Sequence, residues 1–373
     1  MKAILASAAL LLAAPSLAAA QEVETVRSTA APEIAFDGAD FLQLPKDMYL
    51  GEVAGVAVNP KDGHVFVFQR GNTNGPAYGA AAAQMLEFDK AGRFVREIGK
   101  GLYAWSYAHN VRLDPEGNIW AVDKGSDMVV KFNPAGRVTM VYGRKPEASD
   151  ETAHPLEHPK PPLPAVDGQF RQVTDIAWDS QGNGYISDGY INSRVAKVSK
   201  DGRWLKSWGS YGTAPGQFDT LHSIAIDAKD RVFVADRGNR RIQVFDTEGN
   251  LLKIIQINIP YPRESMPAIG NKPNPGPDGF DSAPGAKLQF PGAPWALCIT
   301  PAVAGRQVLY VADAYPGRIY KLDMDGKVLG WLGQSGKQWK QFGWIHEIAC
   351  PTENELYVGE LLNWRLQKLS LRP

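Results

Sequence analysis

The sequence predicts an all-β fold, a six-bladed β-propeller, and three features of the chain support this prediction. A unit of strand, polar turn, strand, polar loop and strand recurs six times in the 373 residues. Within each unit apolar and polar residues alternate with a period of two, which is typical of half-buried β-strands. Most units continue into a fourth strand that ends in glycine, and four-stranded sheets arranged radially form a propeller.

The clearest copy of the unit is FDTLHSIAIDAKDRVFVADRGNRRIQVF, residues 218–245. Apolar alternation predicts three strands, and segments rich in Asp, Gly and Asn predict the connections between them. The expected strands are 223–226, 232–235 and 241–245, with a turn at 227–230 and a polar loop at 236–240. The other five copies begin at Val53, Ala108, Val173, Trp295 and His346.

The residues before the first unit divide into three expected parts. A basic residue, a short apolar segment and small residues at a cleavage site predict a Sec-type signal peptide at 1–20, with a buried N-terminal helix as the alternative. Residues 21–40 are expected to form an N-terminal arm. Segment 41–45, FLQLP, is expected to supply the outer strand of the last blade and to close the ring, so that the propeller spans 41–373.

Two insertions rich in Pro, Gly and Asn, residues 144–168 and 257–287, interrupt the repeat. Both follow the outer strand of a blade, so both lie on the face where the inner strands begin. Long loops of this kind are often lids or binding loops, and we expect these two to be lids over a site.

The composition restricts the class of partner and the compartment. Lysine plus arginine equal aspartate plus glutamate at 40 each, and no basic run is present, so nothing favours nucleic acid or an anionic membrane surface as a partner. No other segment is apolar and long enough to span a membrane, so we expect an exported protein, periplasmic or secreted. Two cysteines do not make a disulfide framework, and we expect Cys298 and Cys350 to be buried thiols.

Three of the six histidines occupy one equivalent position in the repeat. The residues at this position in units one to six are Ala54, His109, Thr174, His222, Trp295 and His346. Histidines on alternate units of a six-bladed ring are related by a three-fold arrangement around the channel that the inner strands line. Three histidines with an open fourth position form a catalytic zinc site, which polarises a bound oxygen. The alternative is that they are packed channel residues.

The loop after the second strand of each unit reaches the same face. It carries Arg70, Lys124, Tyr190 and Arg237 in units one to four. Arginine suits bidentate binding of a carboxylate, and a tyrosine beside a metal or a cation can act as a general acid or base. The alternative for each loop residue is a solvated side chain or an ion pair between blades.

Other basic residues are assigned to the fold rather than to the site. Arg194, Arg241 and Arg365 recur at the start of the third strand, and this repetition predicts a structural role. The three remaining histidines lie in a turn or in the first insertion and are expected to be exposed to solvent: His64, His154 and His158.

The recurring pattern in VADRGNRRIQVF and SDGYINSRVAKV resembles the NHL repeat. From about Leu50 to the C-terminus the chain resembles peptidyl-α-hydroxyglycine α-amidating lyase, through the segments FQRG, DGYINSR, LHSIAID, ADRGNRRIQVF and IHEIA. This resemblance implies a set of roles: zinc on His109, His222 and His346, catalysis by Tyr190, and contact of Arg70 and Arg237 with a substrate carboxylate.

The resemblance also implies a structural calcium, bound by the main chain of Val56 and Val111 and by Glu347, where the family has aspartate. Ile191 replaces a cysteine of the family motif, so the family's disulfides are expected to be missing. No copper monooxygenase domain precedes the propeller, so the chain is not expected to make a hydroxyglycine substrate.

The leading hypothesis is a secreted zinc lyase that cleaves the N–C bond of an α-hydroxyglycine-like carbinolamide to an amide and glyoxylate. Its partner is expected to be a small molecule or peptide with a carboxylate, and the protein to be a monomer. One alternative is another metal-dependent propeller enzyme such as a lactonase, although such propellers usually hold their metal with carboxylates and Asn. The other is a non-catalytic NHL propeller that binds protein or glycan on its rim.

Overall fold

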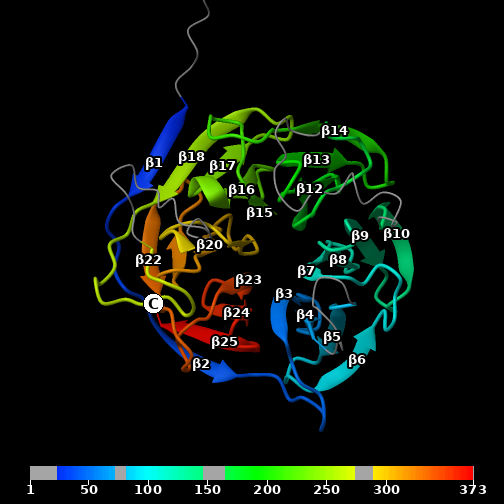
Figure 1. The fold of residues 1–373 in the computed structure, drawn as a ribbon, viewed down its shortest axis with the longest axis horizontal. Helices are drawn as coiled ribbons and strands as arrows, with labels where there is room; N and C mark the ends of the chain where they lie inside the picture. The colour runs from blue at the N-terminus through cyan, green and yellow to red at the C-terminus, as the bar shows by residue number, and fades with distance from the viewer. Residues whose placement is uncertain (1–22, 72–80, 146–163, 274–288, 373) are drawn as a thin grey trace, which may run out of the picture.

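The computed structural model describes residues 23–71, 81–145, 164–273 and 289–372 and confirms the predicted six-bladed β-propeller. Six sheets surround one axis (Figure 1). The predicted signal peptide and the centres of both insertions, 146–163 and 274–288, lie outside the described residues. Among the described residues, no helix is long and apolar enough to cross a membrane.

In each blade the strand nearest the axis comes first, and consecutive strands pair antiparallel. Blade one contains β3 (Glu52–Val58), β4 (Val65–Arg70), β5 (Gln84–Phe88) and β6 (Phe94–Ile98). Blade two contains β7 (Ala108–Leu113), β8 (Ile119–Asp123), β9 (Met128–Phe132) and β10 (Val138–Gly143). Blade three contains β11 (Asp175–Trp178), β12 (Gly184–Asp188), β13 (Arg194–Val198) and β14 (Trp204–Trp208).

The remaining three blades follow the same order. Blade four contains β15 (Leu221–Ile226), β16 (Val232–Asp236), β17 (Arg241–Phe245) and β18 (Leu251–Ile257). Blade five contains β19 (Ala296–Ile299), β20 (Leu309–Ala312), β21 (Ile319–Leu322) and β22 (Val328–Leu332). Blade six contains β23 (Ile345–Thr352), β24 (Glu355–Glu360) and β25 (Arg365–Arg372).

An N-terminal strand closes the ring, as predicted, but it is not the predicted segment 41–45. The closing strand is β2 (Ala35–Asp40), which pairs antiparallel with β25 along its whole length. Segment 41–45 instead connects to blade one through the Gln43 N–H, which donates to the Gly92 carbonyl. The apolar side chains that suggested a strand pack between blades six and one, where Phe41 contacts Tyr357. An outer strand needs few apolar residues, so the polar sequence of β2 concealed its role.

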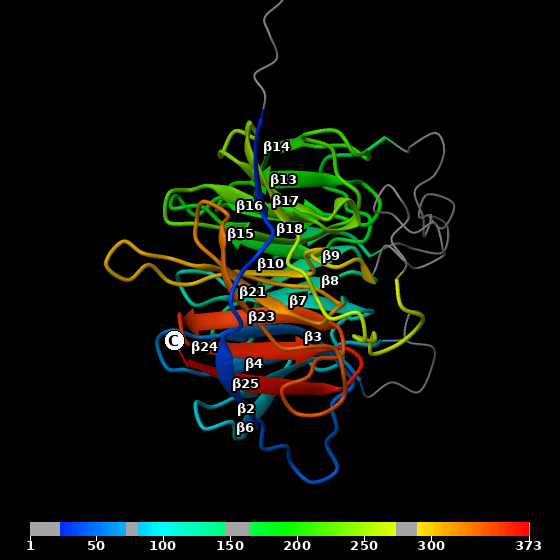
Figure 2. The ribbon, with the colours of Figure 1, turned by 90° about the vertical axis from the view of Figure 1, so that its left-hand side faces the viewer.

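The residues expected to form an arm run along the outer edge of three consecutive blades (Figures 1 and 2). β1 (Glu24–Ser28) adds a fifth strand to blade four by pairing parallel with β18. Next, the Ile34 N–H donates to the Trp331 carbonyl of blade five, and β2 then completes blade six. The segment therefore ties the last three blades together and covers their outer edges.

The inner hairpins turn at an aspartate that the repeat places after the first strand. Oδ1 of Asp114, Asp179 and Asp227 each accepts the main-chain N–H four residues later, at 2.8 Å. An Asx interaction of this kind stabilises a turn locally, which explains why the segments DPEGN, DSQGN and DAKDR form the turns between the first and second strands of their blades.

The hydrophobic core is divided among the junctions between adjacent blades. Five buried clusters each combine apolar side chains from two neighbouring blades, including the junction between blades six and one. A further cluster fills the junction between blades one and two and also includes Trp295, Ala314 and Leu361. The strand pattern of period two directs alternate side chains into these junctions. A blade packed on both faces holds its inner strand, and thus any residue at the start of that strand, in a fixed position.

Cys298 and Cys350 form a disulfide. The prediction that both are buried free thiols is therefore wrong. The cysteines lie on β19 and β23, the inner strands of blades five and six, with Cα atoms 6.0 Å apart. They are separated by 52 residues in the chain. Only the packing of consecutive blades brings them together, and the count of cysteines carries no information about that contact.

Candidate metal centre

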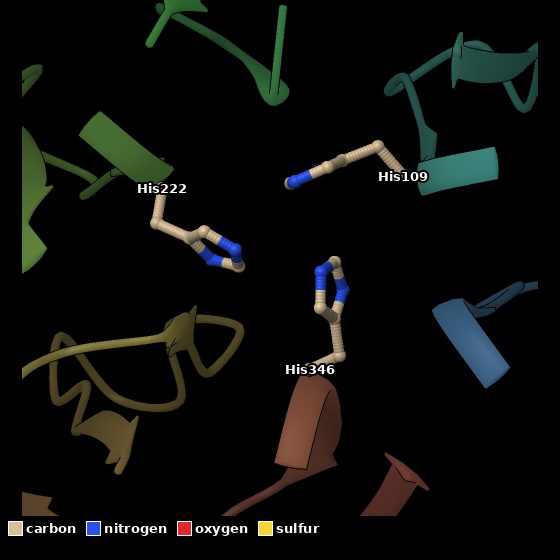
Figure 3. Close-up of side chains that lie close together, drawn as sticks. All are labelled: His109, His222 and His346. Atoms are coloured by element: carbon tan, nitrogen blue, oxygen red, sulfur yellow. The ribbon is translucent and has the colours of Figure 1, made fainter. Parts of the chain in front are cut away.

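Three histidine rings from alternate blades meet at the propeller axis (Figure 3). His109 lies on β7, His222 on β15 and His346 on β23, and all three side chains are buried. Their ring centroids are 4.6 to 4.9 Å apart, and one nitrogen of each ring lies within 4.8 Å of the other two. The structure thus brings together the three histidines that the repeat placed in one position.

Each histidine ring is oriented by the main chain of the next blade. Nδ1 lies within hydrogen-bond distance of a carbonyl oxygen in the pairs His109–Thr174 (2.7 Å), His222–Trp295 (2.6 Å) and His346–Ala54 (2.6 Å). A carbonyl oxygen can only accept, so Nδ1 carries the proton in all three rings. The three acceptors occupy the same repeat position as the histidines. Because histidines occupy this position in every second blade, a histidine N–H donor meets a main-chain carbonyl acceptor at three of the blade junctions.

The inward-facing nitrogens are the candidate ligands. Within the described residues, Nε2 of His109 and Nε2 of His222 are buried and have no hydrogen-bond partner, which is unfavourable for a polar atom. Burial is the largest factor that lowers the pKa of each of the three histidines well below its ordinary value. The rings are therefore neutral and keep a lone pair on Nε2. Three neutral imidazoles around one point fit a metal ion with an open coordination position.

Tyr190 lies beside this cluster and is half-buried. Its ring lies 5.8 Å from that of His109 and 5.9 Å from that of His222, centroid to centroid. Burial raises the pKa of Tyr190, but the positive charges of Arg237, Lys124 and Arg70 outweigh burial, so the net shift is downward. A lowered pKa favours the phenolate form of a tyrosine, and the phenolate can accept a proton from a group bound beside it.

Arg237 is held against two aromatic rings. It begins a short 3-10 turn, η2 (Arg237–Asn239), directly after β16. Gly238 permits this turn, since a Cβ at that position would lie 2.6 Å from the side chain of Asp219. The buried guanidinium carbon of Arg237 lies 4.5 Å from the ring centroid of Trp295 and 5.3 Å from that of Tyr190. The charge of Arg237 also helps to lower the pKa of Tyr190, so the arginine and the phenol act as one unit.

Arg70 reaches the same region but is partly engaged by protein groups. Its Nε donates to the carbonyl of Ala108 at 2.7 Å, and its Nη1 lies 2.9 Å from Oε2 of Glu52 and 3.1 Å from the Tyr107 hydroxyl. The guanidinium carbon lies 3.9 Å from the ring centroid of Tyr107. Both predicted arginines thus lie near the histidines, and Arg237 is the less constrained by acids.

Sequence reasoning underestimated two contributors to the site. Lys124 was noted only as a loop residue, yet its Nζ lies 3.6 Å from the ring centroid of Tyr190. Trp295 occupies the repeat position of the histidines, and its ring packs 5.2 Å from His222 and 5.3 Å from Trp344. Its place in the repeat was the signal that could have identified it as a wall of the site.

The residues that the resemblance assigns to calcium do not fit such an ion. Val56 and Val111 lie on the inner strands β3 and β7. Glu347, however, accepts hydrogen bonds from Nδ2 of Asn110 at 2.7 Å and pairs with Nη1 of Arg112 at 3.0 Å. Two N–H donors therefore face the carboxylate that would have to face the cation.

The basic residues assigned to the fold have the expected structural contacts. Each pairs with the acid at the end of the preceding strand: Arg194 with Asp188, Arg241 with Asp236 and Arg365 with Glu360. His64 is half-buried, and its Nδ1 lies 2.7 Å from Oε1 of Glu87, so this histidine is less exposed to solvent than predicted. His154 and His158 lie outside the described residues.

Comparisons with known proteins support the predicted resemblance. The NHL repeat family matches residues 218–245. NHL repeat-containing protein 3 of Mus musculus is 33% identical over 215 residues, 54% of this chain and 54% of that protein. Peptidyl-glycine alpha-amidating monooxygenase A of Xenopus laevis is 27% identical over 343 residues, 84% of this chain and 31% of that protein. A probable peptidyl-alpha-hydroxyglycine alpha-amidating lyase of Caenorhabditis elegans is 27% identical over 213 residues, 52% of this chain and 56% of that protein.

These matches span about half or less of the length of each relative. Among solved structures, virginiamycin B lyase from Staphylococcus aureus superposes with a TM-score of 0.52 at 13% sequence identity, over 91% of this chain and all of that one. At that identity the likeness concerns the fold alone. The chain is a six-bladed β-propeller that contains an NHL repeat and resembles the amidating lyases.

The buried histidines make a prediction for the metal-free protein. Their pKa values are lowered in the folded state, so below about pH 6.5 the unfolded state binds protons that the folded state does not. The free energy of unfolding should therefore fall as pH decreases below that value, by up to about 1.4 kcal/mol per pH unit for each histidine. Denaturant unfolding of chelator-treated protein between pH 7 and 5 measures this slope. His222→Phe should make it shallower, and an equal slope in both proteins would contradict the assignment.

Proposed function

We propose that this NHL-repeat propeller is an exported zinc-dependent lyase that cleaves the N–C bond of a peptidyl-α-hydroxyglycine-like carbinolamide to an amide and glyoxylate. The observation that carries the proposal is the convergence of three neutral histidines next to Tyr190 and Arg237. Similarity to proteins named as amidating lyases gives the reaction class. The chemistry below follows from the groups in the site.

Zinc is the metal that this ligand set favours. Three imidazole nitrogens without a carboxylate or thiolate are a ligand set typical of catalytic zinc, and a zinc ion held there would supply Lewis-acid polarisation of a substrate oxygen. His109, His222 and His346 would hold it through Nε2, since Nδ1 of each ring is engaged by a carbonyl.

Tyr190 is the proposed base. Its lowered pKa favours a phenolate, which would accept the proton of the substrate hydroxyl. As the C–O bond becomes a carbonyl, the C–N bond breaks and the electron pair moves to the amide nitrogen. The proton then passes from Tyr190 to that nitrogen, so the reaction needs no other reactant and Tyr190 returns to its starting state.

Arg237 and Arg70 are the proposed carboxylate-binding groups. Arg237 lies between the rings of Trp295 and Tyr190, which fix its plane beside the base. A guanidinium in a fixed orientation can hold a carboxylate through two parallel hydrogen bonds. Because Arg70 already bonds Glu52 and the Ala108 carbonyl, we assign the larger share of carboxylate binding to Arg237.

Export of the protein belongs to the same proposal. The disulfide between Cys298 and Cys350 is typical of proteins from oxidising compartments, which agrees with the predicted signal peptide. We propose a periplasmic or secreted monomer that acts on a small molecule or peptide with a free carboxylate.

The metal requirement makes the first prediction of the proposed function. Full-length wild-type protein should contain one zinc per chain and release glyoxylate from α-hydroxyhippurate, and chelation followed by zinc addition should remove and restore the activity. Loss of a second-shell residue costs 10- to 100-fold in many metal sites, so His222→Ala should lower activity by more than about 100-fold and reduce zinc content. His64→Ala, outside the site, is the matched control.

The same assay separates the proposal from its alternatives. Hydrolysis of lactones with no glyoxylate release would indicate a different metal-dependent enzyme. Absence of both zinc and activity in the wild-type protein would indicate a non-catalytic propeller.

Carboxylate binding makes the second prediction. A hydrogen bond to a charged group contributes about 1.5–3 kcal/mol, so Arg237→Gln should lower kcat/KM for α-hydroxyhippurate by roughly 10- to 100-fold. The loss should be smaller with the methyl ester of the same compound, which carries no charge to bind, so that only the effect of Arg237 on the pKa of Tyr190 remains. Steady-state kinetics on both substrates measures the difference.

The control for this experiment is Arg240→Gln in the same loop, because the Arg240 guanidinium donates to the Pro291 carbonyl instead of reaching the site. Equal losses on acid and ester would show that Arg237 does not bind the carboxylate.

A further inference from the structure

A largely buried network centred on Arg112 connects five blades next to the histidine cluster. Arg112 lies on β7, three residues after His109. Its Nε and Nη2 lie 2.9 and 2.6 Å from the two oxygens of Asp175 on blade three, and its Nη1 lies 3.0 Å from Oε1 of Glu347 on blade six. Its Nη2 also lies 3.4 Å from Oγ of Ser223 on blade four.

The carbonyl of Leu297 on blade five completes the set of acceptors, at 3.3 Å from Nη2 of Arg112. One guanidinium thus contacts the inner strands of four other blades. Its planar fork of five donors suits such a position, where several acceptors converge from different directions.

Both carboxylates in the network are buried and fully hydrogen-bonded. The side chain of Asp175 is 0% exposed and that of Glu347 is 2% exposed. Asp175 also accepts from the Ser223 hydroxyl at 2.8 Å and from the Ile224 N–H at 3.0 Å. Glu347 also accepts from Asn110 at 2.7 Å. Arg112 is the positively charged group that pairs with both of these buried acids.

The network is built from residues directly adjacent to the metal-centre residues in the chain. Asn110 follows His109, Ser223 follows His222 and Glu347 follows His346. Asp175 follows Thr174, whose carbonyl accepts the hydrogen bond from His109. A shift of any of these main-chain segments would move a histidine ring or its acceptor, so the network and the histidine geometry are mechanically linked.

A calcium ion does not fit this network. Calcium requires six to eight oxygen ligands at about 2.3–2.6 Å. Here the carboxylate of Glu347 faces N–H donors from Asn110 and Arg112, and a guanidinium bridges the two acids that a divalent ion would bridge.

We propose that Arg112 is a built-in cation that positions the three histidines in place of a second metal ion, so that this protein needs no calcium. The inference rests on the proposed metal centre but not on the lyase reaction. Arg112 is a positioning residue, because it acts on the histidines through the strands that carry them.

The test uses the full-length chain, cobalt(II) as a spectroscopic probe of the histidine site, and the thermal midpoint Tm. Wild-type protein should bind cobalt in calcium-free buffer, and addition of 1 mM calcium should change neither its cobalt affinity nor its Tm. Arg112→Met leaves two buried acids without a cation, so it should bind cobalt at least tenfold more weakly. Millimolar calcium should raise both its cobalt affinity and its Tm toward the wild-type values.

Two further variants keep the test decisive. Arg112→Lys retains the positive charge but lacks the planar guanidinium. It should fold, and its cobalt affinity should lie between those of wild type and Arg112→Met. Arg365→Met breaks a comparable ion pair away from the axis, with side-chain exposures of 17% and 0% for Arg365 and Glu360. It should lower Tm without altering the cobalt spectrum, the cobalt affinity or the response to calcium.

Three results would overturn the inference. The first is a Tm of the wild-type protein that depends on calcium, and the second is a cobalt affinity that is unchanged in both Arg112→Met and Arg112→Lys. The third is a weakened cobalt affinity in Arg112→Met that calcium fails to raise. A wild-type protein that binds no cobalt would refute the metal centre. The calcium dependence of Tm in wild type and Arg112→Met would still test the role of Arg112 as a cation.

Discussion

The hydrogen bond from each histidine Nδ1 to a carbonyl of the next blade is the interaction on which the site depends. It fixes the tautomer, turns Nε2 toward the axis and joins blades two to three, four to five and six to one. These bonds form only if consecutive inner strands keep a constant displacement along the propeller axis relative to each other. The six apolar junctions between blades maintain that displacement. The packing of the blades therefore orients the candidate ligands.

The repeat also separates residues of the fold from residues of the site. Arg241 pairs with Asp236 in the same way as Arg194 with Asp188, and this contact serves the blade wherever it recurs. Arg237 lies four residues before Arg241 but contacts aromatic rings of the site instead. Departures from the repeat, rather than its shared positions, mark the groups with a chemical role.

The histidine cluster could be predicted from sequence because equivalent positions of a closed ring are equivalent in space. Contacts between non-equivalent positions of different blades could not be predicted from the sequence. The closing strand was misplaced because the polar segment Ala35–Asp40 pairs through its main chain, which leaves little trace in side-chain pattern. The Cys298–Cys350 disulfide and the Arg112 network depend on how neighbouring inner strands are offset along the axis, which periodicity alone does not specify.

The central claim is that three imidazoles bind one zinc ion at the propeller axis. X-ray absorption at the zinc edge, recorded on the full-length protein with one equivalent of zinc, tests this claim most directly. The account predicts a first shell with three nitrogens at about 2.0–2.1 Å and the outer-shell scattering of imidazole rings. A shell of carboxylate oxygens or of sulfur, or a zinc signal that persists unchanged in a variant without the three histidines, would contradict it.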